Sequence, residues 1–221
     1  ADIARGKAGN FMKYKVMIVE DQTMPRELFE LRIQASEHFE VALSIDNAAL
    51  ADVYCLRFPV DLILMDVITR DGENGLDAAA RIKRAFPQIK IIIVTSMPEC
   101  SYLKRAKEIG VESFWYKEEQ RESLLDVMER TMNGESVYPG ASPELTLGMA
   151  SSYQFTEREL DILREITSGD TNQEIADRLN MSVATVKTHI LNMLEKTGFR
   201  NRTELAVRAR ESGLVILNRR N

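Results

Sequence analysis

Apolar and polar positions along residues 13–132 divide this part of the chain into two kinds of segment. Five short runs are almost continuously apolar, at 14–19, 39–44, 60–65, 89–95 and 113–116. Runs of this length without a polar face are typical of strands that are buried on both sides. Five stretches with helical spacing follow them, at 25–36, 48–56, 76–86, 101–109 and 121–132. Alternating strands and helices predict an α/β, doubly wound, five-stranded parallel sheet of the flavodoxin-like class.

Beyond residue 132 the pattern changes. Residues 133–153 are rich in Gly, Pro and Ser, which predicts a linker with one helical turn near 143–147. Four amphipathic segments without a strand follow, at 157–168, 172–179, 183–197 and 203–212. They predict a second, small all-α domain of four helices at residues 154–213, with a tail at 214–221.

Composition narrows the class of protein. Hydrophobic residues make up 44% and charged residues 29% of the 221, which is typical of a globular chain and excludes a collagen-like or largely disordered one. No apolar run reaches the roughly 18 residues of a membrane helix. Residues 1–11 are expected to be an expression remnant before Met12, and Cys55 and Cys100 are too few for a disulfide framework. We therefore expect a cytoplasmic protein without a membrane segment.

Charge is distributed unevenly around the net value of −5. Residues 182–221 contain 8 basic and 3 acidic side chains, whereas the preceding stretch 154–181 contains 3 basic and 7 acidic ones. One basic face on an acidic chain is typical of a nucleic-acid-binding protein. A solvated helix face explains the same counts, so charge alone does not decide the function.

Polar side chains follow four of the expected strands. Glu20 and Asp21 follow the first strand, Asp66 the third, Thr95 ends the fourth and Lys117 follows the fifth. The carboxyl ends of parallel strands meet at one edge of the sheet, so these side chains are expected to converge. Three adjacent carboxylates repel one another unless a cation binds, and an all-oxygen cluster suits Mg²⁺. A carboxylate beside Mg²⁺, with a lysine and a threonine nearby, can act as a nucleophile in phosphoryl transfer.

These motifs resemble the receiver domain of response regulators over residues 13–132. The matching stretches are 19–21 (Val-Glu-Asp), 64–66 (Leu-Met-Asp), 94–96 (Val-Thr-Ser) and 114–117 (Phe-Trp-Tyr-Lys). The resemblance implies that Asp66 accepts a phosphoryl group from a phosphohistidine of a sensor histidine kinase.

The same resemblance assigns the other residues of the site. Asp21 and Asp66 would bind Mg²⁺ directly, Glu20 through water, and Ile68 through its backbone carbonyl. Thr95 would be the switch hydroxyl, and Phe114, three residues before Lys117, the switch aromatic residue.

The loop after Asp66 departs from the family pattern. The family usually has Met-Pro three and four residues after the phosphorylated aspartate, where this chain has Thr69 and Arg70. The usual glycine comes one residue later, as Gly75. The longer loop leaves its conformation open.

The second domain resembles the LuxR-type helix-turn-helix over residues 155–213. The matching stretches are 155–160, 169–176 and 182–189. The resemblance makes Lys187 and Thr188 groove contacts and leaves Leu191 to touch a thymine methyl. It gives five candidates for phosphate contact, namely Thr171, Asn172, Thr185, Lys196 and Arg200. Periodicity alone would fit an ordinary helical bundle equally well.

Together the two halves resemble a NarL/FixJ-family response regulator. The resemblance implies a non-enzymatic regulator that binds double-stranded promoter DNA and forms a homodimer when phosphorylated. Whether its receiver covers residues 183–197 before phosphorylation is left open by the sequence. One alternative is a LuxR-type transcription factor that works without phosphorylation. Another is a phosphatase with an aspartyl nucleophile, which would need a second acid where this chain has Ile68.

Overall fold

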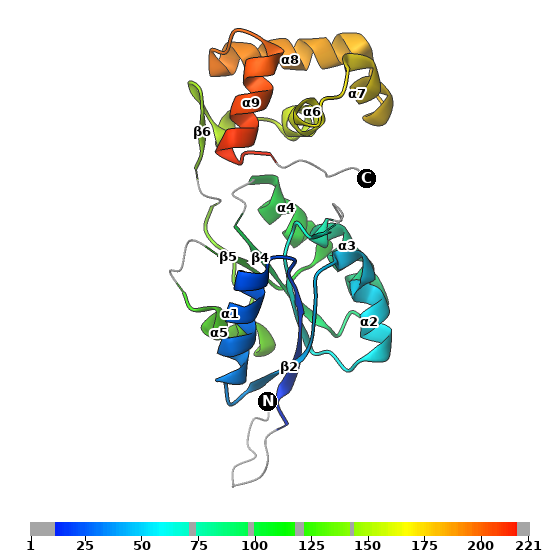
Figure 1. Cartoon of the computed structure of the whole chain (residues 1–221), viewed down its shortest axis with the longest axis vertical. Coiled ribbons are helices and arrows are strands. Elements are labelled where there is room, and N and C mark those ends of the chain that lie inside the picture. The colour runs from blue at the N-terminus through cyan, green and yellow to red at the C-terminus, as the bar shows by residue number, and fades with distance from the viewer. Residues whose placement is uncertain (1–11, 71–73, 97–99, 118–121, 142–143, 216–221) are drawn as a thin grey trace.

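The protein consists of an α/β domain and a helical domain, joined by a segment that contains a small β-hairpin (Figure 1). The computed structural model describes residues 12–70, 74–96, 100–117, 122–141 and 144–215. The expected expression remnant at residues 1–11 therefore lies outside the described residues. Within them, no helix is both long enough and apolar enough to cross a bilayer.

The α/β domain is built on a parallel sheet of five strands in the order β2-β1-β3-β4-β5. The strands are β1 (Tyr14–Val19), β2 (Phe39–Ile45), β3 (Leu62–Met65), β4 (Lys90–Thr95) and β5 (Ser113–Tyr116). The prediction of a doubly wound, flavodoxin-like sheet is thereby confirmed. In this order the chain reverses direction between β1 and β3, which is where such sheets bind ligands.

The helices of this domain lie close to their expected positions. They are α1 (Thr23–Gln34), α2 (Ala51–Arg57), α3 (Gly75–Ala85), α4 (Cys100–Ile109) and α5 (Leu124–Met132). α1 begins two residues before Pro25, because a first helical turn tolerates a residue without an N–H. The expected helix at 48–56 instead starts with a 3₁₀ turn, η1 (Ala48–Leu50), because the side chain of Asn47 accepts the N–H of Ala49.

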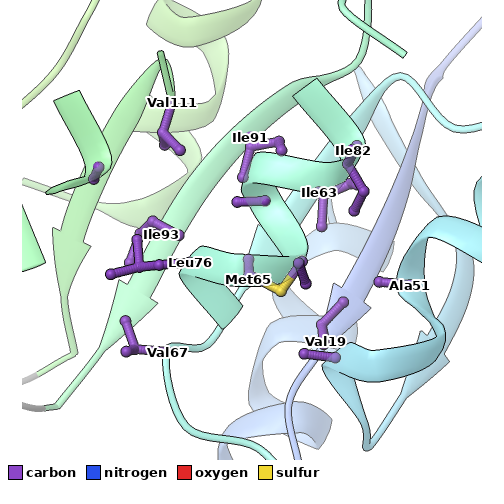
Figure 2. Close-up of a cluster of buried hydrophobic side chains, with 14 of the residues drawn as sticks. Val19, Ala51, Ile63, Met65, Val67, Leu76, Ile82, Ile91, Ile93 and Val111 are labelled. Carbon is purple, nitrogen blue, oxygen red and sulfur yellow. The ribbon is translucent and has the colours of Figure 1, made fainter. Parts of the chain in front are cut away.

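The two faces of the sheet take alternate residues of each strand, as the pleat requires. Ile63, Met65 and Ile91 point to the side covered by α2, α3 and α4, where Figure 2 shows them beneath α3, which contributes Leu76 and Ile82. The intervening residues, such as Leu64, pack against α1 and α5. Because both faces are covered by helices, the central strand β3 is fully buried and entirely apolar.

The segment between the domains differs from the expected linker. β6 (Thr146–Leu147) and β7 (Ala150–Ser151) form an antiparallel hairpin, so the helical turn expected near 143–147 is wrong. The hairpin packs on the helical domain, where Leu147 is buried. Gly148 has a φ of 62°, and a Cβ there would lie 2.1 Å from the carbonyl oxygen of Thr197. Glycine is therefore required for this close approach.

The helical domain contains four α-helices, as expected, after a 3₁₀ turn η3 (Ser152–Gln154). They are α6 (Glu157–Thr167), α7 (Asn172–Arg178), α8 (Val183–Thr197) and α9 (Arg202–Ser212). α7 and α8 form a helix-turn-helix, and Asn180 makes the turn with a φ of 52°. Leu214 and Val215, which were expected to begin the tail, are instead buried in the core of this domain because their apolar side chains close it.

Candidate functional site

The acidic residues at the edge of the sheet are brought together by the strands that precede them. Glu20 continues β1, and its N–H donates to the carbonyl of Ile45 on β2. Asp66 continues β3, and its N–H donates to the carbonyl of Val19 on β1. Parallel pairing thus places the carboxylates side by side. Glu20, Asp21 and Asp66 offer oxygen atoms that all lie within 4.8 Å of one another.

Lys117 lies in the middle of this cluster. Its N–H donates to the carbonyl of Thr95, which places it at the end of β5 beside β4. Its ammonium forms ion pairs with Glu20 and with Asp66, the latter at 2.8 Å between Nζ and Oδ2. Glu20 is fully buried, whereas Asp21 is half-buried. One lysine against three carboxylates leaves a local excess of negative charge.

Electrostatics favour a cation at this site. Burial and the charge of Glu20 raise the pKa of Asp66 to about 7, although Lys117 opposes the shift. Burial also works against the charged form of Lys117, but the two carboxylates raise its pKa above the usual value. A buried carboxyl group whose pKa is raised by its surroundings is typical of functional sites.

The loop after Asp66 keeps its approach to the site despite its greater length. Gly75 donates its N–H to the carbonyl of Val67, and a Cβ on Gly75 would lie 1.9 Å from the carbonyl oxygen of Asp66. Ile68 pairs with Asn74 in a β-bridge that closes the loop. The bridge encloses residues 69–73, of which 71–73 are outside the described part of the chain.

Thr69 and Arg70 tie this loop to the neighbouring β2–η1 connection. The hydroxyl oxygen of Thr69, which is 2% exposed, accepts the N–H of Ala48 at 2.9 Å. Arg70 forms an ion pair with Asp46 at 2.8 Å. A polar clamp thus replaces the usual Met-Pro pair. Sequence reasoning did not find it because the partners lie more than 20 residues away.

We expect that replacing Thr69 by valine destabilises the α/β domain by about 1–3 kcal/mol, because the buried N–H of Ala48 loses its acceptor. The unfolding free energy can be followed by the fluorescence of Trp115, the chain's single tryptophan, which lies on β5. A Thr69→Ser variant keeps the acceptor and serves as the control. Equal stability of the valine and serine variants would contradict this role.

Arg26 is a residue near the site that the sequence reasoning missed. Its Nη1 atom donates to the backbone carbonyl of Glu20 at 3.0 Å from the first turns of α1. This contact holds the backbone that carries Glu20 and Asp21. An arginine six residues after a strand-terminal acid gives no sequence signal by itself, since the helix geometry decides where it points.

The two candidate switch residues lie at neighbouring strand ends. Thr95 is fully buried at the end of β4, and Phe114 is 2% exposed on β5. The Phe114 ring lies 5.0 Å from the ring of Tyr116 and 6.3 Å from the ring of Tyr138, measured between centroids. Phe114 therefore belongs to an aromatic cluster that includes a residue of the interdomain segment.

The helical domain presents one face of α8 to solvent. Val186, Ile190 and Met193 are buried, so the opposite side carries the exposed Lys187 and Leu191. Three further candidates are exposed as well, namely Thr185, Thr188 and Arg200. An exposed helix face that follows a tight turn is the geometry with which helix-turn-helix proteins enter the major groove.

Other candidates for phosphate contact have structural partners. The Lys196 ammonium donates to Glu159 Oε2 at 2.7 Å and to the carbonyl of Gln154 at 2.9 Å. Glu159 thus pairs with the Lys196 ammonium in this structure, and the assignment of Lys196 as a phosphate contact stays a prediction. Asn172 accepts from Arg202 at 2.6 Å, and the side chain of Thr171 caps α7. Thr171 remains exposed.

We expect Lys196→Met to lower the stability of the helical domain at pH 7 by about 1–2 kcal/mol, within the range for hydrogen bonds to charged groups at a partly exposed position. Burial opposes the charged form of Glu159, but the bond from Lys196 lowers the pKa of Glu159 below 4.5. The contribution is therefore present above pH 4.5 and is lost as the pH falls below it. Calorimetry of both proteins across this pH range measures the difference, with Lys187→Met as the exposed control. A difference that persists at low pH would contradict the assignment.

The α/β domain contacts the helical domain through α6. Lys104 of α4 forms an ion pair with Glu157, and Nη2 of Arg164 donates to Ser101 Oγ at 3.4 Å. α8 lies on the far side of the helical domain (Figure 1), and Lys187 and Leu191 on it are exposed. In this arrangement the first domain therefore leaves the exposed face of α8 uncovered, which answers a question that the sequence left open.

The two domains match two described families. Residues 16–129 match the response regulator receiver domain, and residues 153–209 match the bacterial regulatory proteins of the luxR family. The first match covers the sheet with its acidic cluster, and the second covers the helix-turn-helix. The resemblance stated from the sequence is thereby confirmed for both halves.

Proteins that are similar to this chain span both of its domains. The response regulator protein VraR of Staphylococcus epidermidis is 34% identical over 212 residues, which cover 92% of this chain and 100% of that protein. VraR of Staphylococcus aureus is 33% identical over the same length. A structure of two RcsB dimers bound to two parallel DNAs shares the fold, with a TM-score of 0.58 at 18% identity over 89% of this chain and 97% of that one. RcsB from Salmonella enterica serovar Typhimurium, bound to promoter rprA, has a TM-score of 0.55 at 20% identity, over 89% of this chain and 98% of that one. This chain belongs to the response regulators, with an N-terminal receiver domain and a C-terminal domain of the luxR family.

Proposed function

We propose that this response regulator accepts a phosphoryl group on Asp66 from a sensor histidine kinase and regulates transcription by binding promoter DNA through α8. The observation that carries the proposal is the position of Asp66, which lies against Lys117 and within reach of the oxygen atoms of Glu20 and Asp21. Asp66 itself is buried, with 5% of its surface exposed.

The donor set fits Mg²⁺. Three carboxylates whose oxygen atoms lie within 4.8 Å of one another, beside a single lysine, form a hard, anionic site. Asp21 and Asp66 are the direct ligands in this proposal, with Glu20 acting through water and the Ile68 carbonyl completing the protein ligands. Bound magnesium would neutralise charge on the phosphoryl oxygens.

The chain's own residues carry the transfer. A carboxylate oxygen of Asp66 attacks the phosphorus of the kinase phosphohistidine, a P–O bond forms, and the P–N bond breaks with its electron pair returning to the imidazole. Lys117 stabilises the charge of the transferring group from its place beside Asp66. In this proposal Thr95, at the end of β4, donates its hydroxyl to the phosphorylated residue, and Phe114 follows that change as the switch aromatic residue.

DNA binding is assigned to the exposed face of α8. Lys187 and Thr188 are the proposed groove contacts and Leu191 the proposed contact with a thymine methyl, whereas Thr171, Thr185 and Arg200 are the proposed phosphate contacts. RcsB, which shares the fold, is described as a dimer on DNA, and this supports a homodimer of the phosphorylated chain. Two copies would then read half-sites about one helical turn apart.

The phosphatase alternative has no support at the position that it needs. An aspartyl-nucleophile phosphatase requires an acid two residues after the nucleophile, and Ile68 occupies that place here. We therefore propose a single phosphoryl uptake per chain, without catalytic turnover of phosphate esters. The alternative of a regulator that works without phosphorylation predicts DNA binding that is independent of Asp66.

A selection of DNA duplexes tests the whole proposal. The full chain is incubated with acetyl phosphate and Mg²⁺, its mass is measured, and duplexes are selected from a random pool with the treated and untreated protein. We expect the mass of one phosphoryl group on Asp66 and a strong enrichment of a two-part site with the treated protein only. Equal enrichment by both proteins would favour the phosphorylation-independent regulator.

A further inference from the structure

The segment that leaves the α/β domain lies along the free edge of its sheet. β5 is the last strand in the order, and its Phe114 N–H donates to the carbonyl of Val137 at 2.9 Å. The Val137 N–H donates to Ser113 Oγ at 3.1 Å, and the Val137 side chain is buried against the α1 and α5 side of the sheet. The start of the interdomain segment is thus attached to the strand that carries the candidate switch residue.

Tyr138 anchors this attachment on the opposite face of the sheet. Its hydroxyl donates to the carbonyl of Val111 at 2.8 Å, and the Lys107 ammonium of α4 lies 5.0 Å from the centre of its ring. The same ring contacts the ring of Phe114. Burial raises the pKa of the Tyr138 hydroxyl, which keeps it a hydrogen-bond donor at physiological pH.

These contacts make the position of Tyr138 depend on Phe114. Protein cores are packed as densely as organic crystals, so an aromatic ring cannot change rotamer without moving the rings against it. Phe114 and Val137 also share a backbone hydrogen bond, so movement at β5 reaches the segment by two routes.

We propose that Tyr138 is the positioning residue that couples Phe114 to the DNA-binding domain, so that phosphorylation changes how the interdomain segment is held on the β5 edge. This inference rests on the proposed phosphorylation of Asp66. It assigns a role in signalling to a residue of the interdomain segment that contacts Phe114 directly.

Few residues separate Tyr138 from the helical domain. Seven residues, 139–145, connect Tyr138 to β6, whose hairpin is packed into the helical domain at Leu147. α4 carries Lys107 on the Tyr138 ring and Lys104 on Glu157 of α6. A change in the position of Tyr138 therefore affects both connections between the domains. One is the interdomain segment itself, and the other is the contact between α4 and α6.

Hydrogen exchange of the full chain tests the coupling. The amides of Phe114 and Val137 are measured before and after treatment with acetyl phosphate and Mg²⁺, with the added mass recorded in the same sample. In the unsubstituted protein we expect phosphorylation to change their exchange rates by about fivefold or more, the effect of altering a local hydrogen-bonded contact.

Three variants separate the ring contact from general packing. Tyr138→Leu keeps an apolar side chain at the edge of the sheet but removes the aromatic contact. In this variant phosphorylation should change the exchange rates of the Phe114 and Val137 amides by less than about twofold. Tyr138→Phe keeps the ring and should retain the response. Tyr153→Leu, at an exposed tyrosine of η3 in the helical domain, is the matched control and should behave as the unsubstituted protein.

The outcomes distinguish the two levels of the proposal. Mass added at Asp66 without any change at Phe114 and Val137, or a full response in Tyr138→Leu, would overturn the coupling and leave the proposed function intact. Absence of added mass in the unsubstituted protein would overturn the proposed function and this inference together.

Discussion

Asp66→Asn is expected to take up no phosphoryl group from acetyl phosphate in the presence of Mg²⁺, where the unsubstituted chain takes up one. The amide has no anionic oxygen with which to attack phosphorus, and it also removes one of the three carboxylates of the cluster. Because Lys117 still pairs with Glu20, the variant should keep its fold. Intact-mass measurement after a fixed incubation gives the result, and circular dichroism confirms that the sheet is present.

Asp61→Asn is the matched control for this prediction. Asp61 is exposed just before β3, where its carboxylate accepts the N–H of Lys15, far along the strand from Asp66. This variant should take up the phosphoryl group as the unsubstituted chain does. If Asp66→Asn gains the same mass as the control, the modified residue lies elsewhere and the assignment of Asp66 fails.

Lys187→Ala is expected to weaken binding to the selected duplex by about 1–3 kcal/mol, which corresponds to roughly 5- to 150-fold in Kd. The residue is exposed on α8, where a lysine can reach a base edge or a phosphate. Titration of a labelled duplex by fluorescence anisotropy measures the change. Repeating the titration at several salt concentrations then shows which contact is lost, because the loss of a phosphate contact reduces the salt dependence by about one counterion.

The control for Lys187 is Arg208→Ala. Arg208 is an exposed basic residue on α9 that pairs with Glu211 at the surface, so it matches the removed charge without lying on α8. Binding by this variant should stay within about twofold of the unsubstituted protein. Equal losses in the two variants would mean that net charge drives binding and that α8 is not the recognition helix.

Most of the α/β domain could be predicted from sequence because its strands are buried on both faces. The bounds of β1 and β5 agree with the prediction residue for residue, since a mostly buried parallel strand leaves a short and largely apolar run. The strand ends then locate Glu20, Asp66 and Lys117, because parallel pairing forces carboxyl ends onto one edge. The ion pairs at that edge agree with this reasoning.

The elements that the sequence did not predict are short or depend on distant partners. Two-residue strands such as β6 have no periodicity, and their pairing depends on the contact between Gly148 and α8. Lys196 reads as a free surface cation until its partner Glu159, 37 residues earlier, is placed beside it. The sequence around a lysine therefore does not show whether its ammonium is free, because folding can place a distant carboxylate beside it.

The sequence by itself therefore determined the two-domain organisation, the edge of the sheet at which the polar side chains meet and the residues of the acidic cluster, because these follow from local hydrophobic periodicity and strand-end chemistry. The tertiary structure alone decided that Thr69 holds the loop after Asp66, that the Tyr138 ring contacts Phe114, and that α4 contacts α6 while Lys187 and Leu191 of α8 stay exposed. Those contacts join residues that are far apart along the chain, and their free energy depends on distances that only the packed fold sets.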